Sequence, residues 1–275
     1  MPAAHHDDAS ASVAQSHAGV PVAERGAIPA DVIGSASLDN KQYWWYTVRS
    51  ELLERVFRRY VPIGGRVLDV GSADAPSSAW MGALANKTSM DLDPRGLDLE
   101  AGDVVGSVTD IPFADQTFDV VSAFDVIEHV VDEHRALDEI YRLLKPGGYL
   151  LMAVPTYQWA WSSHDVASGH VRRYVKGRAI DALVRSGFNV VRTTYAFAGV
   201  FPFFAAERLG RKLTDAITHK SYTDENAVPV LPQPSPWQNR LLLGASRLDA
   251  ALIARTDLPF GSSFFAAAQK PATQS

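Results

Sequence analysis

The amino-acid sequence predicts an α/β protein with a doubly wound, mainly parallel sheet. From about residue 38 onward, short apolar segments alternate with segments whose apolar residues recur at helical spacing. The first apolar segment is followed by a loop of small residues, and the second ends in acidic residues. Such alternation is typical of parallel strands joined by crossover helices that cover both faces of the sheet.

Length and composition fit one domain with an appended element. Of the 275 residues, 47% are hydrophobic and 21% are charged, which is ordinary for a globular protein. The formal net charge of −5 provides no basic field, so we expect no nucleic-acid partner. Because the sequence has no cysteine, a disulfide scaffold, a thiolate zinc site and a cysteine nucleophile are excluded.

Residues 1–37 are predicted to form a disordered tail, because they are rich in Ala, Ser, His and Asp and show no periodicity. They lack the basic start and the apolar run of a signal peptide. The longest strongly apolar stretch, Tyr195–Ala206, is too short to span a membrane. We therefore expect a cytoplasmic protein with one domain over residues 38–275, and peripheral contact with the inner membrane stays open.

The elements of the domain follow in order. Apolar residues at helical spacing predict a first helix that ends at Pro62 and a second helix over residues 77–85. The Pro-Gly-Gly sequence at 146–148 would end a later helix, and Gly187 would cap the next. Apolar runs bounded by turn residues predict strands over Arg66–Gly71, Thr88–Leu92, Phe118–Phe124, Tyr149–Val154, Phe188–Tyr195 and Ser262–Gln269.

Residues 196–258 interrupt this alternation and are predicted to form a helical insertion before the last strand. They contain an aromatic patch, a proline-rich linker over Val228–Pro236 and an amphipathic helix around residues 241–252. The aromatic patch suits a lipid-like acceptor or a membrane surface, and packing within a helical lid is the alternative. Its members are Phe197, Phe201, Phe203 and Phe204.

The loop after the first predicted strand suits a nucleoside cofactor. That strand ends at Asp69, Val70 and Gly71, and the glycine allows the backbone to approach a ligand. Asp91 follows Gly71 by 20 residues and ends the second predicted strand. A carboxylate there can accept hydrogen bonds from both hydroxyls of a ribose, because open parallel sheets bind ligands at the carboxyl ends of their strands.

Two nucleoside cofactors compete for this site. A dinucleotide needs a G-x-G-x-x-G turn for its pyrophosphate, and the second and third glycines are absent here. Asp69 would place negative charge beside a diphosphate, whereas the ammonium and sulfonium groups of S-adenosylmethionine are cationic. Charge therefore favours S-adenosylmethionine, and a plain strand-to-helix turn is the alternative.

Several motifs together carry a family resemblance. They are Val67–Ala75, Met90–Pro94, Thr109–Asp115, Phe118–Val121, Val126–His129 and Leu143–Pro155. In order and spacing they resemble the type 11 group of class I S-adenosylmethionine-dependent methyltransferases. The resemblance covers most of Leu38–Pro271 and implies a Rossmann-like sheet of seven strands whose last strand is antiparallel.

The expected cofactor-binding residues follow from these motifs and include two departures from the family. Ala73 and Ala75 stand where the family has glycines, so we expect weakened affinity at most. Ser107 stands where the family often has an aspartate for the adenine amino group, and whether Asp110 compensates stays open. The expected residues are Asp69, Gly71, Ser72, Ala73, Asp91, Leu92, Ser107, Asp110 and Asp125.

A narrower subgroup of this family is also similar. It shares Tyr43–Tyr46 with Arg49, the segment Trp161–Tyr174 and a tail like Leu258–Gly261. Its members commonly accompany enzymes of cell-surface glycan and lipid-linked sugar assembly. The resemblance implies that the aromatic run and Arg49 either close over the cofactor or pack the first helix onto the sheet.

The segment after Pro155 is expected to carry the acceptor site, because a loop at the carboxyl edge of the sheet faces that site. Histidine can take a proton from an attacking hydroxyl near neutral pH, and arginine suits an anionic acceptor. The alternative is a solvated basic segment in which Asp165 pairs with His170 or Arg172. The expected catalytic residues are His164, His170 and His129, and the expected acceptor-binding residues are Trp161, Arg172, Arg173 and Tyr174.

Asp125, Glu128 and His129 follow the strand Phe118–Phe124. Asp125 is expected near the transferred methyl group, with a cap for the next helical turn as its alternative role. His129 alternatively packs under the cofactor. As in the related quinone-precursor methyltransferases, the three side chains could form an oxygen-rich metal site. Nothing else in the sequence calls for a metal, so we expect none.

The sequence therefore predicts an S-adenosylmethionine-dependent methyltransferase that methylates a hydroxyl of a small-molecule, glycan or lipid-linked acceptor. The nearest alternative is O-methylation of a quinone precursor. Two alternatives come from other classes. The missing glycines and Asp69 argue against an NAD-type oxidoreductase. Asp69, Gly71 and Asp91 together argue against a non-catalytic binding protein.

Overall fold

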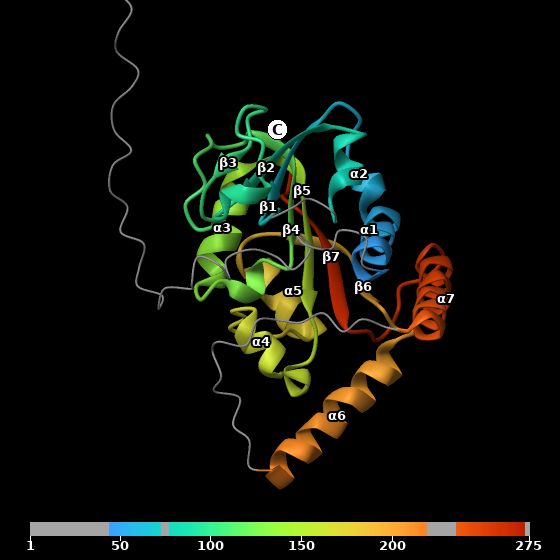
Figure 1. Cartoon of the computed structure of the whole chain (residues 1–275). Coiled ribbons are helices and arrows are strands. Elements are labelled where there is room, and N and C mark those ends of the chain that lie inside the picture. Colours follow the sequence, from blue (N-terminus) through green and yellow to red (C-terminus); the bar gives the residue numbers. More distant parts are fainter. Residues whose placement is uncertain (1–43, 73–76, 219–234, 273–275) are drawn as a thin grey trace, which may run out of the picture. The chain divides into compact units, whose positions relative to one another are not determined.

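The computed structural model describes residues 44–72, 77–218 and 235–272, which belong to one compact unit, Gly34–Ser275. The predicted tail, residues 1–37, lies outside the described residues. Within these ranges, seven strands form one sheet (Figure 1). They are β1 (Arg66–Val70), β2 (Asn86–Asp91), β3 (Val104–Val105), β4 (Phe118–Phe124), β5 (Leu144–Pro155), β6 (Asn189–Ala196) and β7 (Ser263–Gln269).

The strands lie in the order β3-β2-β1-β4-β5-β7-β6. β1 pairs in parallel with β2 and β4, and β4 pairs in parallel with β5. β7 runs antiparallel between β5 and β6, so that Phe265 lies opposite Ala153 on one side and Thr194 on the other. The predicted seven-stranded sheet with an antiparallel last strand is therefore confirmed.

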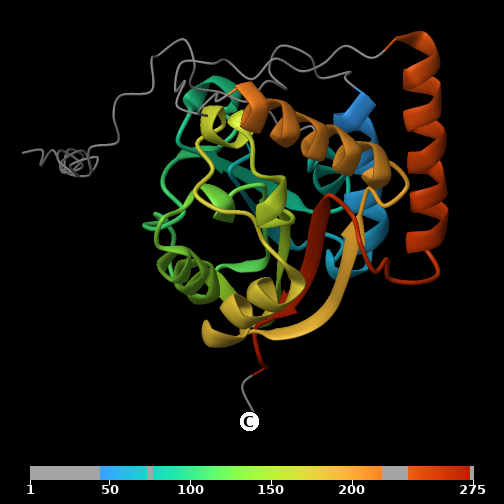
Figure 2. The ribbon, with the colours of Figure 1, turned by 90° about the horizontal axis from the view of Figure 1, so that it is seen from below.

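Helices cover both faces of the sheet (Figure 2). α3 (Glu133–Leu143) and α5 (Lys176–Arg185) lie over one face. Over the other lie α1 (Trp44–Phe57), α2 (Ala79–Gly82) and α7 (Pro236–Ile253), with α1 and α7 packed side by side. None of the described helices combines the length and the apolar character that crossing a bilayer requires.

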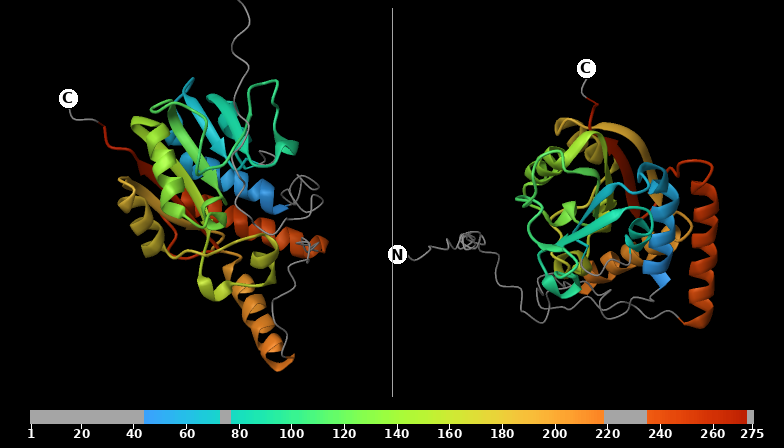
Figure 3. Two further views of the ribbon diagram at one scale, coloured as in Figure 1. Left: turned by 90° about the vertical axis from the view of Figure 1, so that its left-hand side faces the viewer. Right: turned by 90° about the horizontal axis from the view of Figure 1, so that it is seen from above.

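Two further helices lie where β5 and β6 end. α4 (Ser163–Ala167) follows β5, and α6 (Phe201–Thr218) follows β6 and extends away from the sheet (Figures 1 and 3). α6 and α7 both come between β6 and β7 in the chain, in the region where the sequence predicts a helical insertion.

The central strands are buried on both faces, which explains why they are continuous apolar runs in the sequence. Val67 of β1, Val121 of β4 and Leu150 of β5 are fully enclosed. α3 adds the face that carries Leu137 and Ile140, which are equally buried. The core thus lies along the middle of the sheet and holds the strand ends in place.

Three elements differ from the prediction. The helix expected over 77–85 is only the short α2. The edge strand β3 was not predicted, because two residues are too short for a periodic signal. β5 begins at Leu144, before the Pro-Gly-Gly sequence, because Gly147 and Gly148 exchange backbone hydrogen bonds with Lys270 and so extend the strand.

Gly261 lies at a very close contact between β6 and the segment that enters β7. A Cβ atom at this position would lie 2.1 Å from the carbonyl oxygen of Ala196. The Thr156 hydroxyl donates a 2.6 Å hydrogen bond to the Gly261 carbonyl. Because Thr156 follows β5 and Ala196 ends β6, this contact fixes the ends of two strands relative to each other.

We expect Gly261→Ala to lower the free energy of unfolding by about 2–4 kcal/mol, because the backbone of β6 must shift to admit the methyl group. Urea unfolding measures the effect. Gly244→Ala in α7 is the matched control. Its Cβ meets no atom within 4 Å, and alanine should stabilise the helix by about 0.5–1 kcal/mol. Equal stability of the two variants would contradict the proposed crowding.

Candidate functional site

Left-handed residues mark the edge of the sheet where the parallel strands end. Gly71, Asp125, Tyr157 and Phe197 have positive φ angles between 57° and 66°, and they follow β1, β4, β5 and β6 within two residues. This conformation is costly for residues other than glycine and tends to cluster at functional sites. Open α/β sheets bind ligands at this edge. We therefore sought the site here.

Gly71 begins the loop that is expected to hold the cofactor. A Cβ atom here would lie 2.3 Å from Cγ2 of Val126, so glycine alone fits between β1 and the chain after β4. Ser72 is buried, and its hydroxyl has no hydrogen-bond partner within the described ranges. A buried hydroxyl of this kind can serve a ligand. Ala73 lies outside the described residues.

Asp69 makes its contacts within the protein. Its side chain is buried and accepts hydrogen bonds from the hydroxyls of Ser122, at 2.6 Å, and Ser78. The Lys87 ammonium lies 3.7 Å from the same carboxylate. That Asp69 also faces a cationic ligand stays a prediction. The carboxylate is balanced by Lys87, and it ties β1 to β4 and to the turn before α2.

Asp91 and Ser107 lie close together at the ends of β2 and β3. The residue before Ser107 donates its backbone N–H to the Asp91 carbonyl at 2.9 Å. Asp91 is partly buried, and its Oδ1 accepts the N–H of Asp93 at 2.9 Å. The side chains of Leu92 and Asp110 are exposed. Asp91 and Ser107 are thus the two expected cofactor residues that this side of the edge brings together.

Arg49 of α1 is buried at the end of β4. Its Nη2 lies 2.7 Å from Oδ2 of Asp125, and its Nη1 donates to the Ser77 hydroxyl at 2.5 Å. Its guanidinium carbon lies 5.2 Å from the centre of the Trp45 ring. Asp125 therefore pairs with Arg49 instead of capping the next helical turn, η3 (Ile127–His129). The ion pair holds α1 against the end of β4.

Asp165 of α4 holds the segment that follows β5. Its buried carboxylate accepts from Nε of Arg173 at 2.6 Å and from the N–H of Ser162 at 2.8 Å. Nδ1 of His170 lies 2.8 Å from the same group. Burial opposes ionisation, but hydrogen bonds from His170 and Arg173 hold the pKa of Asp165 well below its usual range. Of the partners that the sequence left open, His170 makes this contact and Arg172 does not.

The three expected catalytic histidines lie together at this edge. The rings of His129 and His170 meet edge to face with their centres 4.7 Å apart, and the His164 ring is 6.5 Å from that of His170. Desolvation lowers the pKa of His164 to about 4, although the nearby Asp165 opposes the shift. A neutral imidazole can accept a hydrogen bond or a proton.

Glu128 is a fully buried carboxylate beside these histidines. Neither of its oxygens has a hydrogen-bond partner within the described residues. Burial, and then the neighbouring Asp125 carboxylate, raise the pKa of Glu128 well above its usual range. From the sequence, Glu128 was expected only as a member of a disfavoured metal set, because residue type does not reveal that a short helical turn buries it.

Arg172 and Tyr174 hold their segment to the fold. Arg172 donates to the carbonyls of Val130 and Val131 at 2.6 and 2.7 Å. The Tyr174 side chain is 1% exposed, and its hydroxyl donates to Glu133. Their polar atoms thus contact protein groups, and a role of these two residues in binding the acceptor stays a prediction.

Arg173 and Trp161 complete the expected acceptor residues. Arg173 is buried on Asp165, and its Nη1 also donates to the Thr156 carbonyl at 3.2 Å, so it too stabilises the segment. Its expected acceptor-binding role stays a prediction. Trp161 is partly buried just after η4 (Gln158–Ala160). It remains a predicted acceptor contact.

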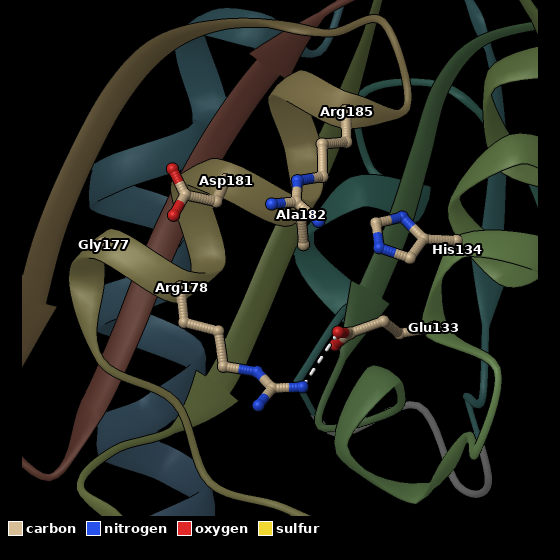
Figure 4. A pocket seen from close by; sticks show the side chains of 7 residues that line it. All are labelled: Glu133, His134, Gly177, Arg178, Asp181, Ala182 and Arg185. Carbon is tan, nitrogen blue, oxygen red and sulfur yellow. Dashed lines mark hydrogen bonds and ion pairs between the residues drawn. The ribbon is translucent and has the colours of Figure 1, made fainter.

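Glu133, at the start of α3, is shared between Tyr174 and two arginines. Arg178 of α5 donates to its Oε1 at 2.9 Å, at the surface pocket between α3 and α5 that Figure 4 shows. Nη1 of Arg172 lies 3.4 Å from its Oε2. Burial opposes ionisation, but the Tyr174 hydroxyl and the two guanidinium groups hold the pKa of Glu133 below its usual range.

Aromatic side chains form a continuous cluster beside the histidines, which we call the aromatic wall. The Tyr157 ring stacks on Tyr195 at 5.9 Å and lies 5.3 Å from Phe201 of α6. Phe201 in turn lies 5.7 Å from Phe260 and 6.1 Å from Phe204. The wall consists of Tyr157, Trp159, Tyr195, Phe201, Phe204 and Phe260.

The sequence predicted this wall only in part. Phe201 and Phe204 belong to it, whereas Phe203 is 60% exposed and Phe197 stacks on Trp45 at 6.0 Å. Tyr157 was missed, because its residue type does not reveal the left-handed conformation that turns the chain after β5.

The chain is similar to known methyltransferases in sequence and in structure. The family model described as a methyltransferase domain matches residues 68–152. A "Probable S-adenosylmethionine-dependent methyltransferase" of Mycolicibacterium smegmatis is 23% identical over 74% of this chain and 77% of the relative. A demethylmenaquinone methyltransferase of Mycobacterium marinum is 33% identical over 62% of this chain and 84% of the relative.

Among solved structures, the fold resembles phosphoethanolamine N-methyltransferase 2 of Haemonchus contortus in complex with S-adenosyl-L-methionine. The TM-score is 0.51 and the identity 19%, over 86% of this chain and 59% of that chain. At this identity the likeness shows the fold alone.

We expect Glu133→Gln to lower the free energy of unfolding at pH 7 by about 2 kcal/mol, because Tyr174 and the arginines lose an ionised acceptor. The folded-state pKa of Glu133 is lowered, so its stabilisation is complete above the unfolded pKa of about 4.3 and is lost as the pH falls through the folded-state value. Urea unfolding at pH 7, 5 and 3.5 should show the difference shrinking at low pH. Asp138→Asn, on the exposed side of α3, is the control, and a pH-independent effect of Glu133→Gln would contradict the ion-pair interpretation.

Proposed function

The chain belongs to the class I S-adenosylmethionine-dependent methyltransferases, and from this membership we propose that it methylates a hydroxyl of a lipid-linked acceptor. The cluster of His129, His164 and His170 and its link to the aromatic wall carry this proposal. The link runs through Arg173, whose guanidinium carbon lies 6.0 Å from the Phe204 ring and whose Nε donates to Asp165, the partner of His170. It sets groups that accept a proton next to a surface that suits hydrocarbon. Family membership removes the NAD-type oxidoreductase from the alternatives.

S-Adenosylmethionine is the cofactor of this family and supplies the methyl group from its sulfonium centre. The residues that would hold it are Gly71, Ser72, Asp91 and Ser107. The buried Ser72 hydroxyl has no hydrogen-bond partner among the described residues, which fits a site completed by a ligand. Asp91 ends β2, where a carboxylate suits ribose hydroxyls.

The histidine cluster would receive the acceptor hydroxyl. His129 of this cluster belongs to η3, which follows Asp125 and the end of β4, and the resemblance implies that the transferred methyl group lies near Asp125. An imidazole of the cluster would accept the proton that the hydroxyl loses on methylation. General-base assistance of this kind contributes roughly 10²–10⁴-fold in rate.

Arg208 of α6 supports an anionic group on the same acceptor. Its guanidinium carbon lies 5.2 Å from the Phe204 ring of the aromatic wall. Its Nε is buried and has no hydrogen-bond partner among the described residues, and the Glu207 carboxylate is 3.6 Å away. A guanidinium group that has an unused N–H donor and lies beside an apolar surface suits a phosphate attached to a lipid.

A quinone precursor is the second candidate acceptor. The Mycobacterium marinum relative is named a demethylmenaquinone methyltransferase, and an apolar quinone side chain would also fit the aromatic wall. Arg208 favours the phosphate-bearing lipid over the uncharged quinone.

We expect Asp91→Ala to weaken binding of S-adenosylmethionine at least tenfold, because a charged acceptor for the ribose hydroxyls is lost. Isothermal titration calorimetry measures the affinity, and Glu100→Ala, an exposed carboxylate nearby, is the control. Unchanged affinity in Asp91→Ala would mean that the cofactor does not lie on β2. Heat of binding with NAD and none with S-adenosylmethionine would overturn the function itself.

The aromatic wall predicts how chain length affects the acceptor. Phe201→Ala should raise the KM for a polyprenyl-phosphate-linked sugar severalfold and leave the KM for a short-chain analogue unchanged, because a ring that contacts the lipid is removed. Phe203→Ala is the matched control on the same helix, since Phe203 is exposed and outside the wall. Transfer of labelled methyl groups measures the KM of each variant for each of the two acceptors. Identical effects of the two variants would contradict a role for the wall.

A further inference from the structure

We propose that Glu128, His129 and His170 bind a divalent transition-metal cation. One carboxylate oxygen and one nitrogen from each ring lie within 4.8 Å of one another. Glu128 and His129 share the turn η3, and His170 comes from the segment after α4. Val171 donates its N–H to the Glu128 carbonyl at 2.8 Å, which holds the two segments side by side.

Glu128 is the carboxylate that lacks a positive partner in this cluster. Nearby, Asp125 pairs with Arg49 at 2.7 Å, and Asp165 pairs with Arg173 at 2.6 Å. Glu128 is completely buried and both of its oxygens are without a hydrogen bond within the described ranges. A buried carboxyl group left in this way is neutral unless a cation balances its charge, so it offers a place for a cation.

The contact between Asp165 and His170 prepares the ring of His170 as a ligand. The carboxylate can only accept at the 2.8 Å contact with Nδ1, so the neutral imidazole carries its proton there and its lone pair on Nε2. Metal-binding histidines are commonly oriented by a carboxylate on the other ring nitrogen in this way. Arg173 and Ser162 fix that carboxylate in turn.

The distances require only a small adjustment. Ligand atoms about 2.0–2.2 Å from a cation lie about 3–3.5 Å from one another, so side-chain rotations of about an ångström close the set. Two imidazoles and one carboxylate suit Zn²⁺, Co²⁺, Mn²⁺ or Fe²⁺ better than the oxygen-seeking Mg²⁺ or Ca²⁺.

This ligand set differs from the one that the sequence suggested and then disfavoured. Asp125 is excluded by its pairing with Arg49, and His170 takes its place. Three protein ligands leave positions open, and a cation here would lie beside the proposed docking place of the acceptor hydroxyl. A role of the cation toward the acceptor hydroxyl rests on the proposed function, whereas binding of the cation to the protein does not.

Titration with Co²⁺ tests the site directly. The full-length protein is treated with a chelator, dialysed and titrated, and visible d–d absorption bands together with calorimetry report binding. We expect Glu128→Gln, which keeps the shape of the side chain, to lower the affinity at least tenfold. His170→Gln should do the same and serves as the second variant if the first is unstable. His164→Gln, outside the ligand set, should retain the affinity of the natural protein.

The sequence also contains His5 and His6, so the comparison of variants decides the result. Equal Co²⁺ affinity in the natural protein, Glu128→Gln and His170→Gln would overturn the inference. Failure of the proposed function gives a different result. If Co²⁺ binds as expected but no lipid-linked acceptor is methylated, the cation site stands and the proposed acceptor is wrong. If a chelator leaves methyl transfer unchanged and the protein binds no Co²⁺, the proposed function stands and the cation site is wrong.

Discussion

Parallel pairing of β1, β4 and β5 brings their carboxyl ends to one edge of the sheet, and the chain must turn sharply at each of them. At Gly71 the turn depends on the missing side chain, because Val126 fills the space that a Cβ would need. At Asp125 and Tyr157 the unfavourable conformation is held by partners, namely the Arg49 ion pair and the stacked ring of Tyr195. Strain of this kind persists only where the surrounding structure compensates for it. The sharp turns at this edge of the sheet therefore place the cofactor loop, the histidines and the aromatic wall.

The buried and partly buried carboxylates of the site divide into two groups. Asp125, Asp165 and Glu133 each contact an arginine and hold one segment to another. Glu128 is buried as deeply as any of them and has no such contact within the described residues. Buried charges are normally paired because desolvation is expensive. A missing partner is therefore more informative about function than a partner that is present, and it separates Glu128 from the carboxylates that stabilise the fold.

Much of the fold could be predicted from the sequence, and less of the site. β4 covers Phe118–Phe124 as predicted, because a strand buried on both faces needs a continuous apolar run. Arg172 and Tyr174 had suitable chemistry for an acceptor, but their actual partners, the carbonyls of Val130 and Val131 and the carboxylate of Glu133, lie about 40 residues away in the sequence. Periodicity does not report such contacts. Residue types could identify the three histidines, whereas their proximity depends on how the segment after β5 folds back onto η3.

β7 is the last strand along the chain, yet it lies between β5 and β6. In the described sheet, β6 forms its ladder with β7, so β6 cannot join the sheet until the chain has been made through residue 269. Before that point on the ribosome, β5 presents an open edge that another chain could pair with. Pairing across residues 197–262 is also a long-range event, which slows folding. The β6–β7 side of the sheet is therefore completed after the rest of the sheet, and the nascent chain is most exposed to mispairing just before β7 has been made.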